Sequence, residues 1–189
     1  MADQAQRDEF QRVMVPHLND AFNLARWLTG NRSDAEDVVQ EAFLKALKHF
    51  GTYRGPEARA WLLTIVRRCC FSWLRVNRSH QLVFTDDEAA IELANRATVI
   101  ALHPKAIETP ETLFNDKETK VLLNQAVEDL PLHYREVIVL REIQGLSYKE
   151  IAEIADIPVG TVMSRLARAR DHLIKHLGGR IGSEASHGL

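Results

Sequence analysis

Two helical patterns joined by a three-residue break constrain the fold of this chain most strongly, and they occupy residues 147–177. Ser147 and Glu150 have the spacing of a capping box, in which a hydroxyl and a carboxylate satisfy free backbone donors at a helix start. The break at 156–158 contains Asp, which tolerates a left-handed turn, and Pro, which is accepted at a helix start but not inside a helix. The second helix is expected to bury an apolar stripe made of Val162, Leu166, Ala169 and Leu173. This pattern predicts a helix-turn-helix.

The second helix of this motif also carries a polar face, made of Thr161, Ser164, Arg165 and Arg168. No carboxylate occurs between Asp156 and Asp171, whereas a merely solvated helix would more often mix both signs of charge. Such a helix packs by one side and enters a DNA major groove by the other. The sequence therefore favours DNA binding over a helical hairpin with a solvated charged face.

The remainder of the chain is also predicted to be helical, and strand-like alternation is absent from the sequence. Helical patterns cover residues 17–28, 33–50, 57–78, 113–130 and 132–144, and Ser33 with Glu36 has the spacing of a second capping box. Residues 81–112 lack a sustained pattern and hold six acids against two bases, which is typical of a flexible acidic linker. We predict an all-α fold of two small helical domains, at 1–80 and 113–177, with a flexible tail at 178–189.

Charge is distributed in blocks, although the net charge of the 189 residues is only −2. The segment from Ala58 to Thr85 contains no acid and five arginines, which are Arg59, Arg67, Arg68, Arg75 and Arg78. Separated basic and acidic blocks indicate one surface for phosphates and another for basic partners. The only two cysteines are adjacent, no apolar run reaches bilayer length, and the N-terminus is unlike a signal peptide, so a cytoplasmic protein is expected.

Three segments together resemble the extracytoplasmic-function (ECF) sigma factors, the smallest members of the bacterial sigma-70 family. SDAEDVVQEAFLKALKHF at 33–50 resembles the core helix of region two, and RGPEARAWLLTIVRRCCFSWLR at 54–75 resembles its promoter-melting segment. LPLHYREVIVLREIQGLSYKEIAEIADIPVGTVMSRLARAR at 130–170 is similar to region four. The resemblance covers roughly residues 8–177. It departs from the family pattern at Arg68 and Ser72, where relatives commonly have Asn and Asp.

This resemblance implies a role for each segment of the chain. Asp37, Gln40 and Glu41 match residues that dock on RNA polymerase, and Tyr53 together with the five arginines of 59–78 matches the part that contacts the −10 promoter element. Thr161, Ser164, Arg165 and Arg168 lie on the helix that would contact the −35 element. The implied partners are core RNA polymerase, promoter DNA and an anti-sigma factor that holds the two domains together. The resemblance implies neither a cofactor nor an enzymatic activity.

Two other classes of protein are considered from the sequence. A helix-turn-helix repressor would explain residues 113–177 equally well, but it would leave the basic segment and the Asp37–Glu41 face unexplained. A metal sensor or enzyme would have to use residues such as His17, His49, Cys69 and Cys70. Adjacent cysteines on a helix point about 100° apart, so they are poorly placed to bind one ion, and we expect no metal site.

Overall fold

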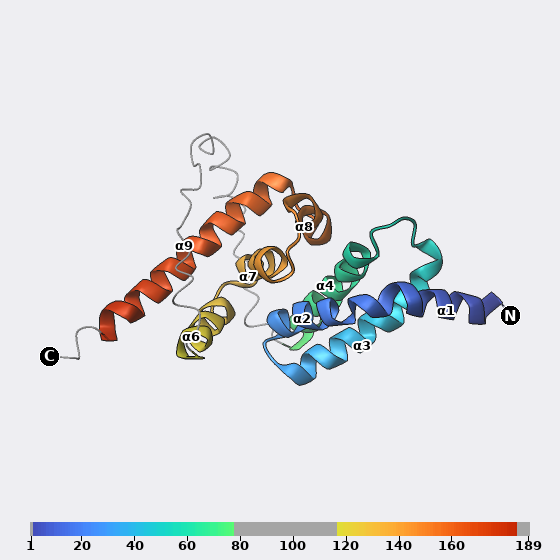
Figure 1. Ribbon diagram of the computed structural model, residues 1–189, viewed down its shortest axis with the longest axis horizontal. Coiled ribbons are helices and arrows are strands. Elements are labelled where there is room, and N and C mark those ends of the chain that lie inside the picture. The colour runs from blue at the N-terminus through green and yellow to red at the C-terminus, as the bar shows by residue number, and fades with distance from the viewer. Residues whose placement is uncertain (1, 78–116, 185–189) are drawn as a thin grey trace.

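The computed structural model describes residues 2–77 and 117–184, and every regular element within them is helical (Figure 1). The all-α prediction is therefore confirmed for these residues. The expected linker at 81–112 and Arg78 lie outside them. The elements are α1 (Ala2–Met14), η1 (Val15–His17), α2 (Leu18–Thr29), α3 (Arg32–His49), η2 (Phe50–Thr52), α4 (Ala58–Asn77), α6 (Lys117–Glu128), α7 (Leu132–Ile138), the π-helical η3 (Val139–Ile143), α8 (Tyr148–Ala155) and α9 (Val159–Glu184). Helix α9 thus extends to Glu184, into the segment expected as a tail.

The connection between α2 and α3 shows where sequence reasoning misplaced a helix start. Gly30 ends α2 in the left-handed conformation, at φ 81°. Asn31, rather than a capping box of Ser33 and Glu36, caps α3, because its side chain accepts a 2.8 Å hydrogen bond from the Asp34 backbone. Glu36 instead pairs with Arg32 on the helix surface, so the Ser33 capping box was wrong.

The N-terminal domain is built from α2, α3 and α4, which pack on one another through small and branched apolar side chains. Its fully buried members include Leu24, Leu28, Val38, Leu62 and Leu63. These residues recur at helical spacing on one face of each helix, which leaves the opposite faces of α3 and α4 available for polar contacts.

The helix-turn-helix of the C-terminal domain has the predicted local geometry. Ser147 and Glu150 form a complete capping box at the start of α8. Asp156 ends α8 in the left-handed conformation, at φ 56° and ψ 48°. Val162, Leu166 and Ala169 of α9 are buried, as predicted, and Leu173 is partly buried against the same core.

Replacing Ser147 with Ala should lower the free energy of unfolding by about 1 kcal/mol, because it leaves a helix-start donor without its partner. Hydrogen bonds from the Ser147 side chain and backbone lower the pKa of Glu150. A carboxylate with a lowered pKa stabilises the fold above the pKa of the unfolded chain, about 4.3, and this contribution is lost as the pH falls through the folded-state value. Urea denaturation at pH 7 and below pH 4 should therefore show a smaller difference between S147A and the unmodified protein in acid. The matched control is S33A, which removes an exposed hydroxyl that caps no helix and should change stability by less than about 0.5 kcal/mol.

The two domains lie against each other, with α2 beside α7 and α4 beside α8 (Figure 1). Their buried apolar residues form one continuous cluster that includes Leu63 and Val66 from α4 and Ile138 and Ile151 from the C-terminal domain. The described part of the chain therefore forms a closed arrangement, which two separate predicted domains did not lead us to expect.

Candidate nucleic-acid and protein interfaces

The polar face of α9 lies beside its buried stripe, as the helical spacing predicts. Thr161, Ser164, Arg165 and Arg168 are all partly exposed. The Ser164 hydroxyl donates to the Thr161 carbonyl at 3.0 Å, whereas Arg168 has no ion-pair partner in residues 2–77 and 117–184. A partly exposed, unpaired guanidinium can read guanine or bind a phosphate.

Arg170, the third arginine of this helix, forms a contact within the C-terminal domain. Its guanidinium forms a 2.8 Å ion pair with Glu142 of η3, and this hydrogen-bonded carboxylate raises the pKa of Arg170. The arginines of α9 therefore have two roles: Arg165 and Arg168 are partly exposed, and Arg170 joins the helix to η3.

Helix α4 holds four of the five arginines of the basic segment, but they occupy two different environments. Arg68 and Arg75 are exposed on the helix surface. Arg59 pairs with Asp20 at 2.6 Å, and Arg67 pairs with Glu136 while lying 4.5 Å from the centre of the Phe71 ring. Thus only part of the predicted −10 surface faces solvent in this arrangement.

Tyr53 was expected to contact a flipped base from a loop, and the structure places it within an aromatic stack. Its ring is nearly parallel to Phe50, with centroids 5.7 Å apart, and lies 5.4 Å from Trp61. The side chain is partly buried, so this stack holds Tyr53 in one position beside the start of α4. A base could stack on it only from its outer side.

The outer face of α3 carries Asp37, Gln40 and Glu41, and all three side chains are exposed. Glu41 forms a 2.6 Å ion pair with Lys45, whereas Asp37 has no ion-pair partner in the described part of the chain. Gln40 lines a surface hollow of about 420 Å³ whose apolar wall includes Leu18, Phe22, Val39 and Phe43. An apolar hollow beside unpaired negative charge suits a partner helix that is both apolar and basic.

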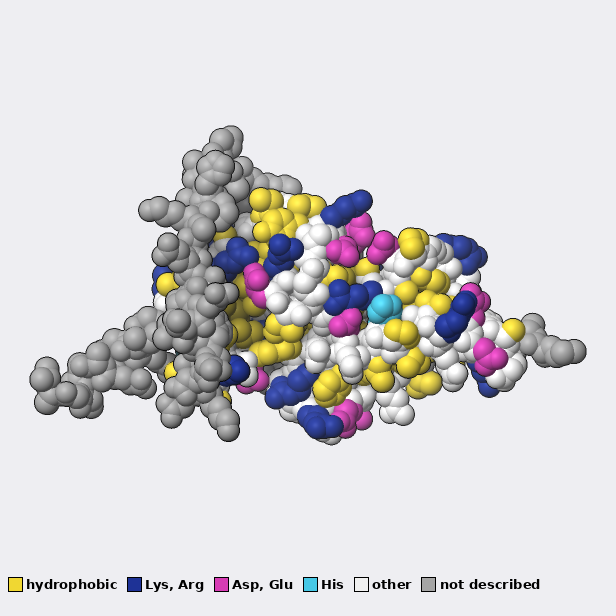
Figure 2. All heavy atoms as spheres, in the orientation of Figure 1, with side chains coloured by type: hydrophobic (Ala, Val, Ile, Leu, Met, Phe, Trp, Pro, Cys, Tyr) yellow, Lys and Arg dark blue, Asp and Glu magenta, His cyan; other side chains and the backbone are white. Residues whose placement is uncertain are grey.

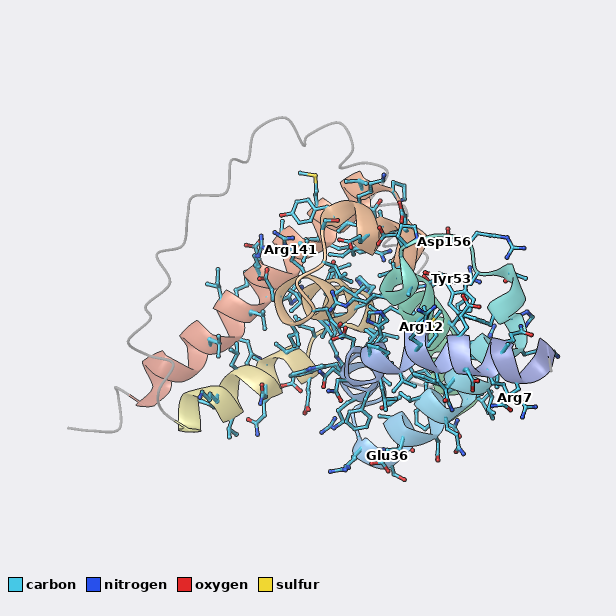
Figure 3. The ribbon with its side chains drawn as sticks, turned by 45° about the vertical axis from the view of Figure 1, so that its right-hand side comes forward. Arg7, Arg12, Glu36, Tyr53, Arg141 and Asp156 are labelled. Carbon is cyan, nitrogen blue, oxygen red and sulfur yellow. The ribbon has the colours of Figure 1, made fainter. Side chains whose placement is uncertain are left out.

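The α3 face and the helix-turn-helix lie in different parts of the molecule. In Figure 3, Glu36 of α3 lies at the far edge of the N-terminal domain from Arg141 and Asp156. Figure 2 shows acidic and basic side chains interspersed over its face of the molecule, without a continuous basic area among the described atoms in that view. The α3 face and the helix-turn-helix are therefore separate surfaces.

The groups considered for a metal site are not assembled into one. Cys69 and Cys70 are buried free thiols, and the described residues contain no cluster of three or more His, Cys, Asp or Glu able to hold an ion. Burial raises the pKa of both thiols, which keeps them protonated and unreactive. None of the helices in the described ranges is long and apolar enough to cross a bilayer.

Asp20, Glu136 and Gln144 are among the polar residues at the domain contact that were not identified from the sequence. Glu136 is fully buried, and this burial raises the pKa of its carboxyl, while the charge of Arg67 opposes the change. One signal was available: Glu136 directly precedes the apolar run VIVL at 137–140, and an acid buried with such a run requires a partner. The partner itself lies 69 residues away in the sequence and gave no local signal.

A helix-turn-helix domain joined to a helical domain with a basic segment and an exposed acidic face is typical of a two-domain DNA-binding transcription factor. Residues 14–80 match Sigma-70 region 2, and residues 120–173 match Sigma-70 region 4. The ECF RNA polymerase sigma-E factor of Escherichia coli K12 is 41% identical over 139 residues, which are 73% of this chain and 71% of that protein. The chain belongs to the ECF group of the sigma-70 family, and it is a transcription initiation factor rather than an enzyme.

Further relatives agree with this assignment. The ECF RNA polymerase sigma factor SigE of Mycolicibacterium smegmatis is 30% identical over 178 residues, covering 92% of this chain and 65% of that protein. The sigma factor RpoE of Bartonella quintana, solved in complex with the anti-sigma factor NepR, has a TM-score of 0.62 at 26% identity and covers 90% of this chain and 97% of its own. CnrH, solved in complex with the cytosolic domain of CnrY, has a TM-score of 0.62 at 25% identity, with coverages of 94% and 93%.

Proposed function

We propose that this chain is an alternative sigma factor that docks on core RNA polymerase through α3 and grips promoter DNA at two points, through α4 and α9. The observation that carries the proposal is the joint presence of both family regions, in order, with an exposed acidic face on the first. A repressor needs only the second region. The presence of the N-terminal region is explained if this region binds RNA polymerase.

The docking surface consists of Asp37, Gln40 and Glu41 beside the hollow under Gln40. Negative charge attracts a basic partner and sets its orientation, while the apolar wall of the hollow accepts its apolar side chains. Asp37 contributes most to this attraction, because Lys45 already offsets the charge of Glu41.

The −10 element is proposed to meet the surface of α4. Arg68 and Arg75 are exposed and available to single-strand phosphates, and Tyr53, packed on Trp61 near the start of α4, offers a ring for an unstacked base. Arg59 and Arg67 join this surface once they are released from their present carboxylate partners. Arg78, which completes the predicted set, lies outside the described residues.

The −35 element is proposed to lie against the polar face of α9. Arg168 has the exposure and the free charge to contact a base or phosphate, and Thr161, Ser164 and Arg165 extend the same face. The capped, left-handed turn at Asp156 fixes the angle at which α9 leaves α8.

An anti-sigma factor is the proposed regulatory partner, and the cytoplasm, where RNA polymerase works, is the proposed location. Two related structures are complexes, one of a sigma factor with an anti-sigma factor and one of CnrH with the cytosolic domain of CnrY. Purifying the protein from cells under native conditions and identifying what accompanies it tests this partner directly.

Promoter-specific initiation after reconstitution with core polymerase tests the function itself. Asp37→Asn should weaken core binding by about threefold to tenfold at low salt, with a smaller loss at high salt, because one attractive charge at an exposed surface is removed. Fluorescence titration of core polymerase measures this change. The matched control is Glu9→Gln, which removes an exposed charge from α1.

Two results would contradict the proposed function. One is the absence of a complex between core polymerase and the unmodified protein. The other is tight, sequence-specific promoter binding by the free protein with no gain on adding polymerase, which would favour a repressor. Equal effects of D37N and E9Q would refute only the docking role of Asp37.

A further inference from the structure

A buried ion pair joins the two domains of this chain. The Arg67 guanidinium, on α4, donates to the carboxylate of Glu136, on α7. Glu136 is fully buried, and its second carboxylate oxygen has no hydrogen-bond partner among the described residues. Burial raises the pKa of this carboxyl, and the charge of Arg165, on α9, also opposes that rise, although less than Arg67 does.

A second set of contacts fastens Arg59. Its Nε donates to Asp20 at 2.6 Å, and its Nη2 donates to the backbone and side-chain oxygens of Gln144, at 2.8 Å and 2.9 Å. The Gln144 amide in turn donates to the Asp20 carbonyl at 2.8 Å. Gln144 directly follows the π-helical η3, and its backbone N–H closes the wide turn onto Val139 at 3.0 Å. Gln144 thus links the C-terminal domain to both α2 and α4.

These contacts use the same guanidinium groups that the −10 surface requires. The N–H donors that Arg67 directs at Glu136, and Arg59 at Asp20 and Gln144, are not available to a phosphate in the same geometry. Burial beneath the C-terminal domain also leaves Arg67 with 18% of its side chain exposed. DNA and the C-terminal domain therefore compete for Arg59 and Arg67.

We propose that this domain contact is autoinhibitory: Glu136 and Gln144 hold Arg67 and Arg59 of the proposed −10 surface, so that the free chain masks its own DNA-binding site without any partner. The inference rests on the proposed role of α4 in promoter binding. Opening the contact separates the domains, frees Arg67 from Glu136 and frees the Nη2 of Arg59 from Gln144, while the Nε of Arg59 keeps its ion pair with Asp20 of its own domain.

The buried ion pair adds little to the free energy that holds the domains together, so the contact can open reversibly. Removing a carboxylate and a guanidinium from water costs much of what their attraction returns, so a buried pair adds little net stability. The unpartnered Glu136 oxygen increases that cost. A partner that binds only the open form can therefore shift the equilibrium with a modest difference in affinity.

The test compares two variants that loosen the contact with a third that does not. Glu136→Gln removes the buried charge with little change of shape, and Gln144→Ala removes side-chain hydrogen bonds without changing any charge. Glu142→Gln is the matched control, because it removes one carboxylate whose partner, Arg170, is in its own domain. The full-length proteins are compared by small-angle X-ray scattering and by titration with a fluorescent single-stranded DNA 12-mer of mixed sequence at low salt.

The inference expects E136Q and Q144A to have a larger radius of gyration and to bind the 12-mer about threefold to tenfold more tightly, because a binding-competent form becomes more populated. E142Q should match the unmodified protein in radius, and its affinity for DNA should change less. Unchanged radius and affinity in both interface variants would overturn the inference, and so would a larger radius without tighter DNA binding. If E136Q fails to fold, Q144A still decides the result. Neither measurement uses polymerase, so failure of core binding would contradict the proposed function separately.

Discussion

Replacing Leu166 with Ala should destabilise the C-terminal domain by about 3 kcal/mol, within the range of 2–5 kcal/mol found for such truncations of buried side chains. Leu166 is 1% exposed and lies in the centre of the stripe by which α9 packs on α8 and α7. Removing it leaves a cavity, because the surrounding side chains relax only partly into the space. Urea denaturation followed by circular dichroism gives the change in the free energy of unfolding.

The comparison that makes this prediction specific is Met163→Ala on the same helix. Met163 is 50% exposed, so its truncation should cost much less than that of Leu166. Similar losses for L166A and M163A would mean that α9 is not packed by the stripe described here, and the orientation of its polar face would then be wrong as well.

Replacing Arg168 with Ala should weaken binding of the polymerase-bound protein to a cognate −35 duplex by about tenfold to a hundredfold, which corresponds to about 1–3 kcal/mol. The guanidinium is partly exposed on the polar face of α9 and has no competing ion pair in the described ranges. Competition titrations of the reconstituted holoenzyme, at several salt concentrations, measure the loss.

The same titrations reveal what Arg168 contacts. A phosphate contact predicts a uniform loss across sequences and a salt dependence reduced by about one charge, whereas a base contact predicts relaxed specificity at one position. Arg12→Ala, on α1, is the control for removing one exposed positive charge. Unchanged affinity of R168A for the duplex would remove Arg168 from the proposed −35 surface.

Local features of the fold could be predicted from the sequence because their signals lie within a few residues. The capping box of Ser147 and Glu150 and the left-handed Asp156 are examples, since side-chain chemistry and backbone preference agree at each position. The misplaced start of α3 shows the limit of this reasoning. Asn31 and Ser33 are both good cap residues, and the left-handed Gly30 decides in favour of the earlier one.

The domain contact could not be predicted, because its partners lie far apart in the sequence. Arg59 and Gln144 are separated by 85 residues, and no periodicity relates them. A run of arginines without acids indicates positive charge, but composition does not reveal that Arg67 and Arg59 contact Glu136 and Gln144 of the other domain. For the same reason the sequence placed Tyr53 correctly in a loop but did not reveal that its ring packs against Phe50 and Trp61.

The burial of Cys70 gives the molecule an internal chemical reporter. Only the thiolate reacts with alkylating reagents, and burial raises the pKa of this thiol so far that the closed form offers almost none. Cys70 lies on α4, as Arg67 does, and the charges of Glu136 and Arg67 both act on the pKa of its thiol. The rate at which Cys70 is alkylated in the native protein therefore records how often this region opens, without any label being introduced.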